Sequence, residues 1–220
     1  MSTASRLPNE TSEYRAARER LLEAEVALRR QMESVAELRR KLPLGGKVPE
    51  DYVFEGAGGP VRLSELFTRG DTLVAYSFMY GPNMEHACPL CTSMLDGLDG
   101  EAPHIREHVS LVVIAKSPIA RIMEHAGRRG WSDLTLLSSH DNDYNRDYLG
   151  EAPDGSQLPM LNVFVKDDGA IRHFYATELL FAKNDAGKDA RHIDLLWPLW
   201  QVLDLTPGGR GTGWYPKLQY

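Results

Sequence analysis

Two cysteines are the residues of this chain best suited to chemistry, and they lie three positions apart in the motif Cys88-Pro-Leu-Cys91. The apolar and aromatic run 72–79 before them has the composition of a buried strand, and a Gly-Pro-Asn cluster that begins at Gly81 ends it. Residues that can begin a helix follow the first cysteine. Strand, turn, Cys-x-x-Cys and helix, in this order, is the context in which a pair of cysteines does redox chemistry.

The position expected for Cys88, at the start of a helix, favours a reactive thiolate. The first N–H groups of a helix lack partners inside it, and the helix dipole places partial positive charge there. That environment lowers the pKa of a thiol, and the thiolate is the nucleophile. Pro89 suits the first helical turn, where its missing N–H costs nothing, and Cys91 lies one turn further along. We therefore expect Cys88 to attack a disulfide and Cys91 to resolve the mixed disulfide that results.

His86 lies two residues before the first cysteine and is a candidate to assist it. As an imidazolium it would stabilise the thiolate, and as a neutral base it would take a proton from an incoming thiol. The alternative is a side chain that points to solvent from a turn, and both interpretations stay open at this point. Glu85 would oppose the formation of a thiolate if it lay close to the sulfur.

The same cysteines also fit metal-binding patterns. With His104 and His108 they reproduce the C-x2-C-x12-H-x3-H spacing of a zinc finger. We reject that interpretation because two glycines and Pro103 are expected to interrupt the continuous helix that a finger needs. A zinc site made of His86 and the two cysteines, or a module that senses redox state, remains an alternative to an enzyme. The sequence carries no dinucleotide-binding fingerprint, phosphate-binding P-loop or serine nucleophile elbow, so no cofactor is expected.

Composition narrows the class of protein. The chain has 220 residues, of which 42% are hydrophobic and 9% aromatic, enough for the core of one domain with an appended element. A net charge of −6 argues against a nucleic-acid partner. No apolar run is long enough to span a bilayer, and residues 1–15 lack the apolar core of a signal peptide, so we expect a cytoplasmic protein without a membrane partner. In a reducing compartment two neighbouring cysteines are expected to be catalytic, redox-sensing or metal-binding rather than a structural disulfide.

A long helix is predicted over residues 11–42. Apolar side chains recur there at a spacing of three to four residues, with one polar interruption at Gln31, and glutamate and arginine fill most other positions. Such a stripe packs against its own domain, against a partner helix, or against both. Two interpretations follow: a homodimer formed through this helix, and a solvated helix along the edge of the domain.

Downstream of this helix, strands and helices alternate. Strands are expected at 52–54, 109–115, 161–165 and 170–175, and the segment 61–67 is expected to be a strand that enters a short helical turn. Helices are expected at 118–129 and 192–203, the second with a break or kink at Pro198. Asp167-Asp168-Gly169 is a hairpin turn signal between the last two strands. This order predicts an α/β domain over residues 46–206, between an N-terminal helical extension at 1–45 and a Gly/aromatic tail at 207–220 that is mobile or lies on a partner surface.

Several short motifs carry a resemblance to a known family. Besides the cysteine motif they are Asp51-Tyr-Val-Phe-Glu-Gly56, Phe78-Met-Tyr-Gly-Pro82, Asp96-Gly-Leu-Asp-Gly100, Gly130-Trp131, Ser138-Ser139, Tyr144-Asn145 with Asp147-Tyr148, and Leu203-Asp-Leu-Thr-Pro207. In these motifs the chain resembles a bacterial thioredoxin-like family of unknown function, whose members are often labelled dithiol-disulfide oxidoreductases. The resemblance implies a central mixed sheet flanked by helices, a protein or small-molecule thiol or disulfide as substrate, and an external reductant.

The resemblance also implies roles for residues outside the cysteine motif. In thioredoxin-like folds a cis-proline faces the reactive cysteine just before the strand that leads into the hairpin. Pro159 stands in that position, and whether its peptide bond is cis is left open. The segment 138–148 is a characteristic loop of the family, and we favour an ordinary acidic surface loop over a set of polar groups that line the cleft.

One missing pattern and one further hypothesis complete the functional prediction. The usual peroxiredoxin active-site pattern is absent, because His86 takes the place where a hydroxyl is wanted. An enzyme of specialised metabolism that uses Cys88 on a small thiol or electrophile is a third hypothesis beside the oxidoreductase and the binding module. It would depend on the same cysteine without cycling a disulfide.

Overall fold

The predicted N-terminal helix is confirmed. The computed structural model describes residues 7–183, 198–206 and 215–220, and in it α1 runs over Ser12–Arg40. Thr11 caps this helix, its hydroxyl oxygen accepting a hydrogen bond of 3.1 Å from the N–H of Tyr14. The chain divides after Pro43 into two compact units, of which α1 and its flanks form the first. No side chain of α1 is buried.

The second unit, Leu44–Tyr220, is built on a mixed sheet. Its described strands are β1 (Val53–Gly56), β2 (Gly59–Arg62), β3 (Thr72–Phe78), β4 (Ser110–Ala115), β5 (Leu136–Ser138), β6 (Met160–Asp167) and β7 (Ala170–Ala176). They lie in the order β2-β1-β5-β4-β3-β6-β7. Each predicted strand is present, and the strand predicted to enter a short helical turn within 61–67 does so: β2 ends at Arg62 and a 3-10 turn, η1 (Leu63–Glu65), follows.

The connections around β3 define the fold. β3 and β4 are parallel and joined by α2 (Pro89–Arg106), and β4 and β5 are parallel and joined by α3 (Ile119–Arg129). On its other side β3 pairs antiparallel with β6, which returns as β7 after a turn in which Asp168 and Gly169 have positive φ angles. A strand that enters a Cys-x-x-Cys helix, returns in parallel and is flanked by an antiparallel hairpin is a thioredoxin-like arrangement. The predicted fold class is therefore confirmed.

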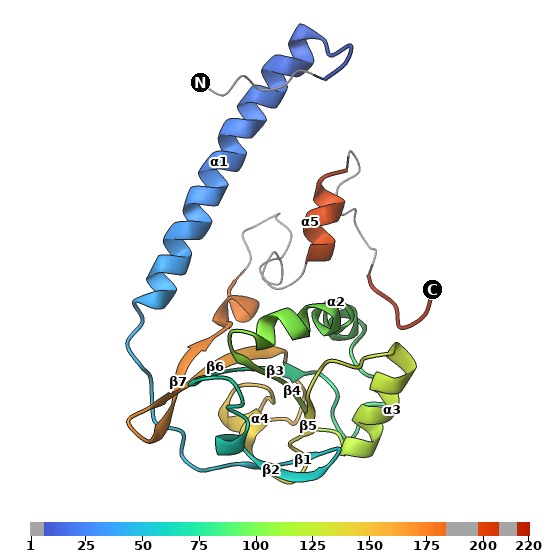
Figure 1. Ribbon diagram of the computed structural model, residues 1–220. Coiled ribbons are helices and arrows are strands. Elements are labelled where there is room, and N and C mark those ends of the chain that lie inside the picture. The colour runs from blue at the N-terminus through green and yellow to red at the C-terminus, as the bar shows by residue number, and fades with distance from the viewer. Residues whose placement is uncertain (1–6, 184–197, 207–214) are drawn as a thin grey trace. The chain divides into compact units, whose positions relative to one another are not determined.

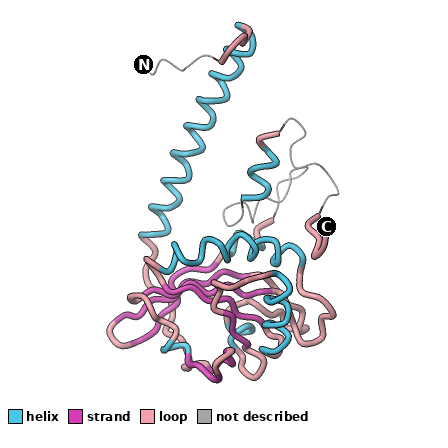
Figure 2. The backbone as a smooth tube through the Cα atoms, turned by 45° about the vertical axis from the view of Figure 1, so that its right-hand side comes forward, coloured by secondary structure: helices cyan, strands magenta, loops and turns pink. Residues whose placement is uncertain are grey.

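Alternate side chains of the central strands pack on opposite faces of the sheet. On β3, Tyr76 and Phe78 join the core beneath α2 and α3, whereas Leu73 and Ala75 join a second core with η1 and α4 (Tyr144–Asp147). Figure 1 shows α2 and α4 on opposite sides of the sheet, and Figure 2 shows α2 lying along its face. Because both faces are covered, β4 is buried along its whole length.

The helix that follows the cysteines is longer than the sequence predicted. It runs without interruption to Arg106, through both glycines and through Pro103. The prediction that these residues break the helix is wrong. Met94, Leu95 and Ala102 form a buried face, and packing this face against the rest of the unit outweighs the weak helix propensity of the glycines and the proline.

The C-terminal part follows the predictions less closely. The helix predicted from residue 192 is described as α5 (Pro198–Asp204), so it begins at the proline expected to break it, while 192–197 lie outside the described residues. Of the predicted tail, 207–214 lie outside the described residues. Its end, 215–220, contacts its own unit: Pro216 is buried, and the Leu218 carbonyl accepts a hydrogen bond of 2.8 Å from Arg129. Within the described part of the chain, no helix combines the length and apolar character that crossing a membrane requires.

Candidate functional site

The predicted dithiol lies at the first turn of α2. Cys88 is the N-cap residue and Pro89 the first helical residue, as the sequence predicts. The N–H of Cys88 donates to the Met79 carbonyl at 3.0 Å, and the Cys88 carbonyl accepts from the N–H of Thr92 at 2.9 Å. Both cysteines are free thiols; Cys88 is half-buried, whereas Cys91 is only 1% exposed. Of the two cysteines, Cys88 is therefore the one that is partly exposed to solvent.

A hydrogen bond between the two sulfur groups sets their ionisation. The hydrogen bond from the Cys91 thiol, with the backbone N–H groups of residues 90 and 91, lowers the pKa of Cys88 to about 6 against the opposing effect of burial. The same hydrogen bond, followed by burial, raises the pKa of Cys91 well above its ordinary value. At neutral pH Cys88 therefore carries the negative charge and Cys91 keeps its proton, which is the arrangement that an attacking and a resolving thiol need.

Tyr76 is a site residue that the sequence analysis missed. Its phenol is buried on β3 and forms a hydrogen bond with the Cys91 sulfur, which favours the thiolate of that residue. Burial, followed by the charge and hydrogen bond of Cys91, raises the pKa of Tyr76 itself, so the phenol stays protonated. A tyrosine in an apolar strand has the pattern of a core residue. The only signal in the sequence was a hydroxyl on the strand that leads to the cysteines.

His86 does not take part in the ionisation of the dithiol. Its side chain is 71% exposed, and its Nε2 lies 3.6 Å from the Glu85 carboxylate, which is 89% exposed. The groups that shift the pKa of Cys88 are Cys91, burial and the backbone of residues 90 and 91, and His86 is not among them. The structure therefore places His86 as the solvent-facing side chain of a turn, near Cys88 in sequence but outside its hydrogen-bonding partners.

Pro159 lies beside the loop that carries the cysteines. It directly precedes β6, whose first residue, Met160, pairs with Ser77 at the end of β3. The adjoining residue Gln157 lies against that loop so closely that a Cβ on Gly81 would come within 2.8 Å of its Cγ. Pro159 therefore directly precedes the strand that leads into the hairpin, as predicted, and that it faces Cys88 stays a prediction. Every described peptide bond is trans, however, and this settles the isomer that the sequence left open.

Buried hydrogen bonds fix the loop between β3 and α2. The Ser117 N–H donates to the Tyr80 carbonyl at 2.9 Å, and its hydroxyl donates to the Gly81 carbonyl at 3.0 Å. Arg121 on α3 donates to the carbonyls of Pro82 and Met84 at 2.9 and 2.6 Å. The backbone that leads to Cys88 is therefore held both from the turn after β4 and from α3.

The segment 138–148 is not an ordinary acidic surface loop, and that prediction is wrong. Ser138, Ser139, Tyr144 and Asn145 are all buried. The Ser139 hydroxyl donates to the Asn145 side-chain oxygen at 2.7 Å, and the Ser138 hydroxyl donates to the Ser117 carbonyl at 2.7 Å. Ser139 and Asn145 thus satisfy each other, and Ser138 joins the end of β5 to the turn after β4.

The two aspartates of the Asp96-Gly-Leu-Asp-Gly100 motif attach α2 to the end of α3. Asp96 pairs with Arg129 and accepts a hydrogen bond of 2.9 Å from the Trp131 indole. Asp99 accepts from three consecutive backbone N–H groups, those of residues 132 to 134, at 2.9 to 3.2 Å. These contacts give the motif a structural role, and through Arg129 they also place the C-terminal segment.

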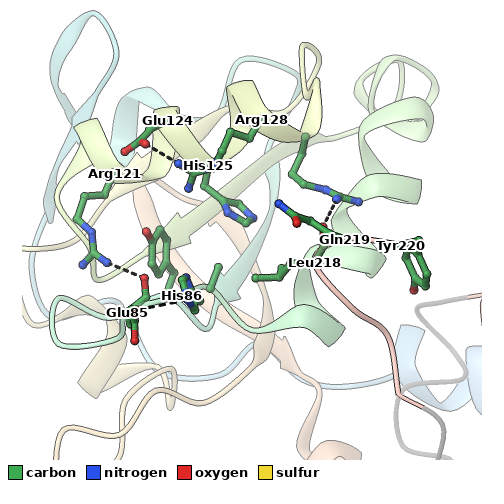
Figure 3. A pocket seen from close by; sticks show the side chains of 12 residues that line it. Glu85, His86, Arg121, Glu124, His125, Arg128, Leu218, Gln219 and Tyr220 are labelled. Atoms are coloured by element: carbon green, nitrogen blue, oxygen red, sulfur yellow. Dashed lines mark hydrogen bonds and ion pairs between the residues drawn. The ribbon is translucent and has the colours of Figure 1, made fainter.

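A cavity of about 1000 Å³ lies beside the loop that precedes Cys88, and neither cysteine is among the residues that line it (Figure 3). It lies between the loop at Glu85–Ala87, α3 and the last three residues of the chain, and Arg121, His125 and Arg128 line it from α3. His125 is buried and its Nε2 lies 3.1 Å from the Thr92 hydroxyl. Burial, followed by the charges of two nearby arginines, lowers the pKa of His125 to about 4, so its ring is neutral at pH 7.

Nothing in the described residues supports a metal site. No group of three or more His, Cys, Asp and Glu side chains within them is placed to hold a metal ion. The zinc-finger spacing belongs to a single helix, α2, which carries Cys91 and His104 several turns apart and ends before His108. A zinc site that adds His86 to the cysteines is unsupported as well, because His86 faces solvent beside Glu85.

The fold and the dithiol together define a thioredoxin-like protein with a Cys-x-x-Cys site. More particularly, the chain belongs to a family described as "bacterial protein of unknown function (DUF899)", whose profile matches residues 4–220. Among curated proteins no match is found.

Solved structures with a similar fold include three redox proteins. Peroxidoxin BcpB from Mycobacterium tuberculosis is 20% identical over 70% of this chain and 94% of that chain, with a TM-score of 0.48. Peroxiredoxin Q from Xanthomonas campestris is 16% identical over 69% and 91%, with a TM-score of 0.45. The exposed lipoprotein thioredoxin Etrx1 from Streptococcus pneumoniae is 12% identical over 66% and 96%, with a TM-score of 0.43. At these values the likeness concerns the fold alone.

Proposed function

We propose that this chain is a thiol-disulfide oxidoreductase in which Cys88 attacks and Cys91 resolves. The observation that carries the proposal is the placement of the pair: Cys88 is half-buried at the N-cap of α2, and Cys91 is buried three residues along the same helix. The hydrogen bond between the two lowers the pKa of Cys88 to about 6 and raises that of Cys91. A nucleophile that is ionised at neutral pH and a protonated second thiol within hydrogen-bond reach are the two groups that disulfide exchange requires.

In the first step the Cys88 thiolate attacks one sulfur of a substrate disulfide, R–S–S–R. A bond forms between Cys88 and that sulfur, the substrate S–S bond breaks, and R–S⁻ leaves and takes a proton from solvent. The charge on Cys88 is then gone, so the main cause of the raised pKa of Cys91 disappears. The Tyr76 phenol and a backbone hydrogen bond with Met79, which both favour the Cys91 thiolate, remain in place.

In the second step the Cys91 thiolate attacks the Cys88 sulfur. The intramolecular disulfide forms, the bond to the substrate breaks, and the second R–S⁻ leaves and is protonated. The two cysteines have given up two electrons and two protons, and one disulfide has become two thiols. An external dithiol reductant returns the pair to the free thiols present in this structure.

The test is a pair of single substitutions in the full-length protein. With dithiothreitol as reductant, Cys88→Ser is expected to abolish disulfide turnover. Cys91→Ser is expected to stop turnover after one step and to accumulate a mixed disulfide on Cys88, visible as a mass increase of one R–S group in intact mass spectrometry. Full turnover by Cys88→Ser would show that the mechanism is wrong.

A further inference from the structure

The C-terminal segment 215–220 is attached to α2 and α3. Arg129, at the end of α3, pairs with Asp96 of α2 and donates a hydrogen bond of 2.8 Å to the Leu218 carbonyl. Two residues earlier Pro216 is buried, and its ring fixes the φ angle of the backbone there. The arginine and the buried proline therefore hold the segment beside α2, the helix that begins at the cysteines.

From this attachment the segment reaches the dithiol. Asp96 follows Cys88 by eight residues along α2, or about 12 Å at 1.5 Å per residue. Tyr215 precedes Leu218 by three residues, which span up to about 10 Å of extended chain, and its side chain adds to that reach. The last three residues also face Glu85–Ala87, the loop that leads into the first cysteine, across one cavity (Figure 3). The segment therefore lies between the side of α2 and the loop before the site.

Tyr215 is the residue of the segment that lies near the sulfurs. Burial, followed by the charges of Cys88 and Cys91, raises the pKa of its phenol to about 12. Tyr215 in turn contributes to the raised pKa of Tyr76, the buried phenol that bonds to Cys91. Charges at a protein surface are largely screened beyond about 8 to 10 Å, so the ring lies within that range of the pair. It is 50% exposed, with one half on the protein and the other in solvent.

The size of a disulfide decides how much free surface it needs around the half-buried Cys88. A disulfide in a folded protein carries chain on both sides of each sulfur, whereas a small disulfide brings only a short stem. We propose that Tyr215 covers one side of Cys88, so that small disulfides react there and the disulfides of folded proteins are excluded. This inference rests on the proposed oxidoreductase function and narrows its substrate class. The exchange step is the balanced one given above, and the phenol takes no part in it.

The test compares a small disulfide with a protein disulfide. Full-length Cys91→Ser protein is mixed at pH 8 with the disulfide of mercaptoethanol or with insulin, and intact mass spectrometry follows the mixed disulfide on Cys88. Each rate is divided by the rate of the same disulfide with free dithiothreitol, and the corrected insulin rate should be the slower. Adding Tyr215→Ala should raise the insulin rate about tenfold relative to the small disulfide, because the incoming chain no longer has to move a half-buried ring into water.

Two further variants separate the cover from other roles of the segment. Tyr215→Phe keeps the ring and should keep the ratio of the two rates. Tyr220→Ala is the matched control and should keep it too, since Tyr220 is a tyrosine of the same segment that is 86% exposed. Insulin as fast as the small disulfide before Tyr215 is changed, a ratio that does not rise in Tyr215→Ala, or an equal rise in Tyr215→Phe or Tyr220→Ala would overturn the inference and leave the oxidoreductase proposal in place. Failure of both disulfides to react with Cys88 would overturn both.

Discussion

At the level of single residues, the chemistry of this site is set by which of two sulfurs keeps a proton. Cys88 is the N-cap of α2, but the largest cause of its lowered pKa is the hydrogen bond from Cys91, and backbone groups of the helix come after it. The position of Cys91 three residues along the helix therefore does more than allow a disulfide to close. It supplies the proton that stabilises the attacking thiolate, and its burial keeps that proton away from solvent.

This dependence predicts the pH profile of Cys88 alkylation by iodoacetamide. Because its pKa is lowered to about 6, the thiolate fraction should rise as pH increases through 6 and level off above pH ~7.5. In Cys91→Ala the hydrogen bond is lost, and the midpoint should move up toward the ordinary value of about 8.5. His86→Ala is the control and should leave the midpoint in place, since His86 is not among the groups that shift this pKa. A midpoint near 8.5 in the unmodified protein would contradict the assignment.

The hydrogen bond between Tyr76 and Cys91 leads to a separate prediction about the second step, the resolution of the mixed disulfide. In Tyr76→Phe the Cys91 thiolate loses one hydrogen-bond donor, so resolution of the mixed disulfide should slow by about tenfold. The first step should be nearly unchanged, because Tyr76 bonds to Cys91 rather than to Cys88. Rapid-quench mass spectrometry of one turnover separates the two steps. Tyr144→Phe removes a buried hydroxyl from the opposite core and is the matched control; equal slowing by both variants would assign the effect to lost packing.

At the level of elements, α2 and the start of β5 are joined by one carboxylate. Asp99 accepts hydrogen bonds from three backbone N–H groups in the loop that ends α3. Asp99→Ala leaves these groups without their acceptor, and the free energy of unfolding should fall by about 1–3 kcal/mol. Urea denaturation of the reduced protein measures it. Glu101→Ala, at an exposed position of the same helix, should change stability by less than about 0.5 kcal/mol. A similar loss in both variants would show that the loop is held by other contacts.

The secondary-structure elements show which parts of the fold could be predicted from the sequence and why the others could not. β3, β4 and the β6–β7 hairpin were predictable because their patterns are local: apolar runs, and a turn signal between two strands. The continuity of α2 was not, because glycine and proline are weak helix formers locally while the packing that compensates for them is formed with distant strands. Neither was the burial of Asn145, since its partners, Ser139 and Gln157, satisfy it only in the folded state.

The residues of the candidate site also fall into two groups, those that the sequence predicted and those that it did not. The place of the two cysteines in the first turn of a helix was predicted from their spacing, and the proposed order of reaction from the physics of a helix N-terminus. Tyr76 and Tyr215 were not predicted, because each comes under the influence of the cysteines only through the fold: Tyr76 from a buried strand, and Tyr215 from a segment more than a hundred residues further along the chain. Residues that act on a site by tertiary proximity alone leave no spacing to detect.

At the level of the whole molecule, the helix of the first unit, α1, carries an apolar stripe that is exposed to solvent. Leu21, Leu28 and Leu38 on α1 are 52%, 62% and 66% exposed. They belong to a series at alternating three- and four-residue spacing that matches the a and d positions of a heptad pattern and whose one polar member is Gln31: Tyr14, Ala17, Leu21, Ala24, Leu28, Gln31, Val35 and Leu38. Leu22, Val26 and Met32 lie outside this series. Long helices with such a seam reach stability by packing it against another helix. We propose that α1 pairs with α1 of a second copy of this chain.

The pairing predicts a dimer in solution whose stability depends on the seam. Light scattering coupled to size-exclusion chromatography of the full-length protein should give twice the mass of one chain, and removal of residues 1–42 should give the mass of one. Leu21→Glu combined with Leu28→Glu should also give a monomer, because each places a charge inside the seam. Glu23→Lys, at an exposed position outside the a and d series, is the control and should remain dimeric. A full-length chain that elutes as a monomer would leave α1 as a solvated extension, and the disulfide chemistry at Cys88 would then belong to each chain acting alone.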